Sequence, residues 1–170
     1  MRSVTMDTLK SYNALLIPDV TYGLRNYPNE ILEKSAPEYL AFLRQLTASC
    51  ESAGLPAFAD FYFARLLPEE QTAIMNQLSD SQRLRIRQLI SEHAPVNLLT
   101  DSSANPASDL VDDTIYFQFE GANDPDLELL ADLTARELLF STFYFTRPIC
   151  TVWGNWGLRY PCFYKGSDRL

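Results

Sequence analysis

The chain has 170 residues, of which 46% are hydrophobic and 21% charged, and this composition excludes disordered, collagen-like and disulfide-dense proteins. Its formal net charge of −8 argues against general nucleic-acid binding, which requires clustered Lys and Arg, and favours basic partners. We expect a single domain, residues 1–170, because a chain of this length can bury one hydrophobic core.

The first part of the chain, residues 1–95, is predicted to be helical. Its clearest helix start is Ser35-Ala36-Pro37-Glu38, which combines a hydroxyl N-cap, an early Pro and a Glu three residues after the cap. The apolar stripe that follows ends at Gly54, and an aromatic segment, 58–67, begins after Pro56. Four or five helices are expected, over about residues 6–16, 28–34 (a short turn or helix), 37–53, 68–78 and 79–93.

Residues 96–113 are rich in Ser, Asn, Asp and Pro, which favour turns and do not sustain a helix. We expect a polar loop here that separates the helical part from a second part, 114–170. Two subdomains joined through this loop are the alternative to one compact domain.

The second part is predicted to contain an antiparallel sheet and one helix. β-branched and aromatic residues predict a strand over 114–119, and Asp124-Pro125 is typical of a helix start. Gly154-Asn155-Trp156-Gly157 predicts a tight hairpin turn between strands 149–153 and 158–164. The expected fold class is α+β, with a helical N-terminal half packed with a small C-terminal antiparallel sheet plus one helix.

Localisation is inferred from the early sequence and the cysteines. The first apolar run, 14–17, is interrupted by Pro18, which does not resemble a secretory signal, and nowhere are there enough consecutive apolar residues for a membrane span. The three cysteines form an odd number, so we expect free thiols and a cytoplasmic protein. A disulfide between Cys150 and Cys162, opposite each other in a terminal hairpin, is the alternative.

The most informative feature is a run of acidic residues. Ten acids lie between Asp101 and Glu137, and only Arg136 offsets them. Such a block attracts basic protein surfaces, whereas the plainer explanation is a solvated face with helix capping by Asp124. The candidate partner-binding acids are Asp109, Asp112, Asp113, Asp124 and Asp126.

The tail combines aromatic residues with a small excess of basic ones. Most of the rings are expected to belong to the core of the sheet, although basic residues interleaved with aromatics also occur in single-stranded nucleic-acid binding. Trp153 and Trp156 flank the predicted turn, and they cannot easily both be buried. They complete the set of candidate partner-binding residues, because exposed Trp side chains often anchor protein interfaces.

No cofactor-binding or catalytic motif is recognised, and we expect neither a cofactor nor a metal ion. His93, the only histidine, is predicted to cap a helix end rather than to act as a base. The leading hypothesis is therefore a non-enzymatic, cytoplasmic protein-binding module, immunity- or neutraliser-like, that engages a basic protein through an acidic face. The alternatives are an enzyme with a pocket between the helical half and the sheet, and an inhibitor that mimics nucleic acid.

Overall fold

The computed structural model describes residues 1–93 and 114–166, and for residues 92 and 93 only the backbone. Its internal contacts divide the chain into two compact units, Met1–Phe61 with Tyr116–Leu170, and Tyr62–Ile115. The first unit therefore combines the N-terminal and the C-terminal parts of the chain. The loop predicted over 96–113 lies outside the described residues, and the expectation of a single domain stays a prediction.

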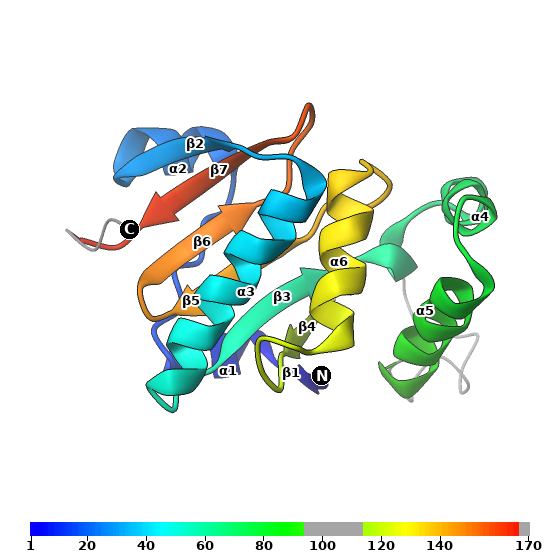
Figure 1. Cartoon of the computed structure of the whole chain (residues 1–170), viewed down its shortest axis with the longest axis horizontal. Helices are drawn as coiled ribbons and strands as arrows, with labels where there is room; N and C mark the ends of the chain where they lie inside the picture. The colour runs from blue at the N-terminus through cyan, green and yellow to red at the C-terminus, as the bar shows by residue number, and fades with distance from the viewer. Residues whose placement is uncertain (94–113, 167–170) are drawn as a thin grey trace, which may run out of the picture. The chain divides into compact units, whose positions relative to one another are not determined.

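The first unit is built on a seven-stranded sheet with the order β1-β4-β3-β5-β6-β7-β2. Neighbouring strands of known register run antiparallel. Figure 1 shows the central strands crossing behind two helices. The strands are β1 Arg2–Val4, β2 Asn29–Glu33, β3 Ala57–Phe61, β4 Ile115–Gln118, β5 Thr142–Thr146, β6 Ile149–Trp153 and β7 Arg159–Tyr164.

One face of this sheet is covered by α3 (Ala36–Ser52) and α6 (Pro125–Ala135), which lie side by side in Figure 1 and pack against each other. The predicted capping box is present at the start of α3, where Glu38 accepts a hydrogen bond from the backbone of Ser35 at 2.9 Å. From the first turn of α3, Tyr39 stacks on Tyr160 of β7 with ring centroids 3.7 Å apart. The helix is therefore fixed to the sheet by the stripe that the sequence predicted.

The opposite face is covered by the N-terminal helices α1 (Met6–Ser11) and α2 (Val20–Asn26). Leu9 of α1 packs in one cluster with Phe58, Tyr116 and Tyr144. Gly23 of α2 lies so close to Phe163 that an added Cβ would be 2.6 Å from its ring. Because side chains alternate along a strand, the aromatic residues of β5 serve both faces, with Phe143 against α3 and Tyr144 against α1.

The second unit contains a 3₁₀ turn, η1 (Phe63–Arg65), and two helices, α4 (Pro68–Asn76) and α5 (Asp80–His93). Glu70 accepts a hydrogen bond from the Leu67 backbone at 2.8 Å, and Gln82 accepts one from the Ser79 backbone at 3.1 Å. At Ser79 the cap is reciprocal, because the Ser79 hydroxyl also accepts a hydrogen bond from the Gln82 N–H at 3.3 Å, whereas Leu67 has no side-chain acceptor. Both helices start close to where the sequence placed them.

The predicted distribution of helices and strands is wrong. The sequence indicated a helical N-terminal half and a small C-terminal sheet, whereas β1, β2 and β3 all lie within the first 61 residues and the strands are spread through the chain. Each of these strands has only three to five residues. Over so short a length, periodicity does not distinguish a strand from a helical turn, and the partner strands are distant in sequence.

Several boundaries also differ from the expectation, mostly at residues with positive φ. The helix predicted over 6–16 ends at Ser11, just before Asn13 with φ 59°. The helix that starts at Asp124-Pro125 ends at Ala135, before Glu137 with φ 58°. The segment predicted as a turn or helix over 28–34 is the strand β2. Asn13 belongs to a residue type that favours the left-handed region and often ends helices, whereas Glu137 carries no such stop signal.

Candidate functional site

The β6–β7 turn holds the most exposed large apolar side chain of the described chain. Trp156 is 62% exposed, and its ring makes an edge contact with Phe140, with centroids 4.7 Å apart. Leu158, two residues further on, is 38% exposed with φ 55°. Gly157 between them has φ 69°, a conformation that glycine adopts without strain. Trp156, Leu158 and the partly buried Phe140 are called the Trp156 surface below.

Backbone contacts fix this turn at both ends. The Glu137 carboxylate accepts a hydrogen bond from the Gly157 N–H at 2.6 Å, and the Leu158 carbonyl accepts one from the Lys34 N–H at 3.3 Å. At its start, Gly154 N–H donates to the Ser141 carbonyl at 3.1 Å. An added Cβ at Gly154 would lie 2.8 Å from the same carbonyl oxygen, so only glycine allows this close approach. The exposed Trp is therefore held by an ordered backbone.

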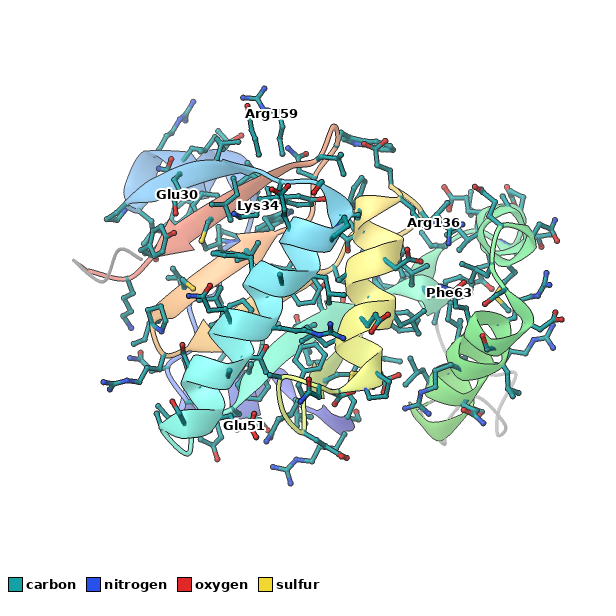
Figure 2. All side chains as sticks on the ribbon, viewed as in Figure 1. Glu30, Lys34, Glu51, Phe63, Arg136 and Arg159 are labelled. Carbon is teal, nitrogen blue, oxygen red and sulfur yellow. The ribbon has the colours of Figure 1, made fainter. Side chains whose placement is uncertain are left out.

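Charged groups border the Trp156 surface. Arg159, labelled in Figure 2, forms a salt bridge of 3.2 Å with Glu33, and both side chains are largely exposed. The Lys34 ammonium lies 5.0 Å from the centroid of the Phe42 ring. Burial, and then the charge of Glu137, raise the pKa of Tyr160, the first buried residue of β7. Partly exposed apolar residues bordered by a salt bridge and a lysine resemble the centre and rim of a protein interface.

Trp153 has a different environment from Trp156. It is partly buried and packs against the cluster formed by Leu15, Ile17 and Phe163 on the face of the sheet that α2 covers. The two Trp side chains are therefore not part of one surface. The structure fits the expectation that they are not both buried, while a role in partner binding stays a prediction for each.

The two candidate acids that the structure describes are buried at the start of α6. Asp124 is 5% exposed and Asp126 is 2% exposed. Asp124 caps the helix by accepting hydrogen bonds from the Asp126 N–H at 2.9 Å and the Glu120 N–H at 3.0 Å. Its carboxylate also lies 3.0 Å from the Met1 amino group. These contacts assign a structural role to Asp124, in line with the capping explanation.

The Met1 amine is held by two carboxylates, Asp124 and, at 3.2 Å, Glu120. Burial lowers the pKa of this amine, but the hydrogen bond and charge of Asp124, together with those of Glu120, outweigh burial and raise it above its ordinary value of 8.0. The amine is consequently charged at neutral pH, which balances part of the negative charge at this corner.

The other described acids of the run also have contacts within the chain. Glu128 forms a salt bridge of 2.8 Å with Arg44 of α3, and Asp132 forms one of 3.1 Å with Arg136. Glu137 fixes the β6–β7 turn. The remaining candidates, Asp109, Asp112 and Asp113, lie outside the described residues, so their predicted role in binding is not tested.

The cysteines are free and buried. Cys150 is paired in register with Tyr164, and Cys162 with Val152, so the two thiols are diagonal neighbours on adjacent strands rather than directly opposite. A hydrogen bond with Cys162 and burial raise the pKa of the Cys150 thiol well above its ordinary range. Such a thiol is protonated and a poor nucleophile. The side chain of His93, predicted to cap a helix end, lies outside the described part of the chain.

One cavity, of about 610 Å³, lies between the end of α3 and the β5–β6 turn. It is lined by the hydroxyl residues Ser49, Ser52 and Thr146, by the exposed Arg147, and by apolar residues. Arg147 is its only charged lining residue. Behind it, the Cys50 sulfur accepts a hydrogen bond from the Arg147 N–H at 3.3 Å. The lining supplies hydroxyls and one cation, without an acid-base pair.

No protein family, curated protein or solved structure was found to match this chain. Over residues 1–93 and 114–166, no three His, Cys, Asp or Glu side chains are grouped as metal ligands would be. Within the same ranges, no helix combines the length and the apolar character needed to cross a membrane.

The sequence reasoning identified Trp156 but missed the residues that fix it. Phe140 and Glu137 lie 16 and 19 residues before Trp156 in the sequence. They approach the turn because they precede β5, whose first residue, Thr142, pairs with Trp153 at the end of β6. An acid near the C-terminal end of a helix is usually unfavourable. The sequence around Glu137 therefore contained no signal that its carboxylate would bind the β6–β7 turn.

Proposed function

We propose that this chain is a protein-binding module that docks a partner protein on the Trp156 surface. The observation that carries the proposal is that Trp156 is 62% exposed although the turn bearing it is fixed by two backbone–backbone hydrogen bonds and one to the Glu137 carboxylate. Trp is strongly enriched among residues that dominate binding energies at interfaces. A side chain on an ordered backbone also loses less conformational entropy on binding than one on a flexible loop.

The Trp156 surface has the composition expected of a small interface. Trp156, Leu158 and Phe140 supply apolar area, and the Glu33–Arg159 pair with Lys34 supplies a polar border. Salt bridges at such a border contribute little affinity but help to select and orient the partner. The partner should therefore carry an apolar pocket or groove with charged groups around it.

The chemistry of the partner is proposed from net charge. A charge of −8 attracts basic proteins over long distances and raises their association rate. The proposal assigns this long-range attraction to the chain as a whole, because Asp124 and Asp126 are buried. A neutraliser that covers the active surface of a basic protein in the cytoplasm is one version of this proposal, and it rests on analogy of size and charge.

The experiment compares capture by the wild-type chain, by Trp156→Ala and by Tyr22→Ala from lysate of the native host. Tyr22 is a matched control, since it is another exposed aromatic residue, 44% exposed, on α2. Proteins retained by the wild type and by Tyr22→Ala but lost with Trp156→Ala would identify the partner. A set of retained proteins that is identical for Trp156→Ala and the wild type would overturn the proposal.

A direct readout uses the Trp153→Phe variant, in which Trp156 is the only Trp. Its fluorescence should be red-shifted in the free protein, because the ring is solvated, and should shift to shorter wavelength on addition of the captured partner. An unchanged spectrum at saturating partner would show that Trp156 remains in water and is not the anchor.

A further inference from the structure

The strand β2 forms a free edge of the sheet. It is the last strand in the order, and within the described residues it pairs only with β7. The ladder is bordered by hydrogen bonds from Tyr164 N–H to the Pro28 carbonyl at 2.9 Å and from Lys34 N–H to the Leu158 carbonyl at 3.3 Å. Since peptide groups alternate in direction along a strand, Glu30 and Leu32 also bond to β7. The N–H and C=O groups of Asn29, Ile31 and Glu33 consequently face away from the sheet.

This edge has few of the usual protections against pairing. Natural edge strands are kept very short, or contain charged side chains, Pro or a bulge, and of these β2 has only the charges of Glu30 and Glu33. The opposite edge, β1, has only three residues, whereas β2 has five, with neither Pro nor Lys and with an unbroken register. Ile31 in its centre is 40% exposed. An open edge with an exposed apolar side chain is typical of a strand that pairs with another chain.

The charges along β2 show which strand fits. Glu30, Leu32 and Lys34 share one face of the strand, because side chains alternate. Figure 2 labels Glu30 and Lys34. Glu30 accepts a hydrogen bond from the Tyr164 hydroxyl, and Lys34 lies over the Phe42 ring, but neither forms a salt bridge within the residues that the structure describes. One face therefore presents an acid, an apolar residue and a base at regular spacing. When two identical strands pair antiparallel, the acid of each strand can therefore face the base of the other, and the two apolar residues can face each other.

We propose that the β2 edge binds β2 of a second copy of this chain, antiparallel, about a two-fold axis at Leu32. In this register Glu30 of each copy faces Lys34 of the other, and the two Leu32 side chains face each other. The outward peptide groups of Ile31 meet those of Glu33 from the second copy, so four hydrogen bonds extend the sheet. The contact is isologous, as closed dimers require.

Three other two-fold registers centred within 30–33 match outward peptide groups. Those centred on Glu30 and on Glu33 place two Glu side chains opposite each other, which is unfavourable, and the third is centred on Ile31. It places Glu30 opposite Leu32 and Lys34 opposite Pro28 of the second copy, which leaves both charges without a partner. Charge complementarity therefore favours the Leu32 register. Because a pair of five-residue strands buries less than the 1,600 Å² or so of a standard interface, we expect a reversible dimer whose population depends on concentration.

The test is sedimentation of the full chain between about 1 and 300 µM, a range that covers weak affinities. The wild type should shift from monomer towards dimer as concentration rises. Ile31→Pro should remain monomeric, because its lost N–H points outward and no bond to β7 is removed. A wild type that stays monomeric throughout, or a dimer that persists in Ile31→Pro while circular dichroism shows a folded chain, would overturn the proposal.

Two further variants test the register. Leu32→Cys should form a disulfide-linked dimer under mild oxidation, since directly opposite, non-hydrogen-bonded residues approach to about 4.5 Å between Cα atoms. Lys34→Glu should weaken the dimer about tenfold by placing like charges opposite each other, and Glu30→Lys with Lys34→Glu should restore it. Failure of both the crosslink and the restoration would exclude this register. Lys34 also borders the Trp156 surface, so Ile31→Pro and Leu32→Cys, which lie outside that border, are the variants that separate the dimer from the proposed function.

Discussion

At the start of α6 Asp124 is 5% exposed and is surrounded by three donors, whereas at the β6–β7 turn Trp156 is 62% exposed and its ring has one aromatic neighbour. The sequence marked both residues as partner-binding candidates. The acid is used within the chain to cap a helix and to hold the Met1 amine, while the apolar ring is left in water. A residue type that usually lies outside is thus buried, and a type that usually lies inside is exposed.

The largest effect on stability is expected from Asp124→Ala. The substitution removes the cap of α6 and leaves the Met1 amine with Glu120 alone, so the free energy of unfolding should fall by about 3 kcal/mol. Urea unfolding measures this loss. Glu128→Ala, which breaks a largely exposed salt bridge with Arg44, is the control and should cost at most about 1 kcal/mol. Equal losses in the two variants would contradict the structural role of Asp124.

The two Trp residues should separate stability from binding. Trp153→Ala removes a ring from an apolar cluster and should lower the free energy of unfolding by about 2 kcal/mol, without changing partner affinity. Trp156→Ala should cost less than about 1 kcal/mol, from the Phe140 contact, and should weaken binding more than tenfold. Urea unfolding and titration calorimetry check the two quantities. If Trp153→Ala weakened binding and Trp156→Ala did not, the partner-binding surface would instead lie around Trp153, on the other side of the sheet.

Glu137→Gln should have a smaller effect on both quantities. The amide keeps the hydrogen bond to Gly157 N–H but loses the charge, so stability should fall by about 0.5 kcal/mol, whereas Glu137→Ala should cost about 1 kcal/mol. If the ordered turn matters for binding, Glu137→Ala should also weaken partner affinity severalfold. An unchanged affinity in Glu137→Ala would mean that Trp156 acts without the support of Glu137.

The smallest effect is expected from pH. The pKa of the Met1 amine is raised in the folded chain, so its stabilising contribution is complete below pH 8.0 and is lost as pH rises through the folded pKa. The free energy of unfolding should therefore decline above about pH 8, and this decline should be shallower in Asp124→Asn. Urea unfolding at a series of pH values gives both slopes. Identical slopes would show that Asp124 does not bind the amine in solution.

Local signals in the sequence were reliable where a cap or a glycine determined the structure. The start of α3 at Ser35-Ala36-Pro37-Glu38 and the start of α6 at Asp124-Pro125 are found where they were predicted. The β6–β7 hairpin joins the predicted strands, but its pairing ends at Val152 and Cys162, so the turn is not tight. Each depends on hydrogen bonds or backbone angles within a few residues of chain. The aromatic tail was also correctly placed in the core, although its rings serve both faces of the sheet.

The strand β2 shows why the fold class was missed. Its residues follow Pro28, a common first residue of helices, and the sequence 29–33 contains no alternation that would favour a strand. Its extended conformation is set by the ladder to β7, about 130 residues away in the chain, because a single strand has no hydrogen bonds of its own. Because β7 is so distant from β2 in sequence, the sequence also did not show that β2 is an open edge, where the second copy is proposed to bind.

The sequence by itself determined the helix starts, the hairpin turn and the excess of negative charge, since these depend on neighbouring residues or on composition alone. Only the tertiary structure decided which polar groups are used internally and which apolar groups stay exposed. Asp124 and Trp156 differ because Met1 lies beside Asp124 and no described segment covers Trp156. Burial is a property of what packs around a residue, and a linear pattern does not contain it.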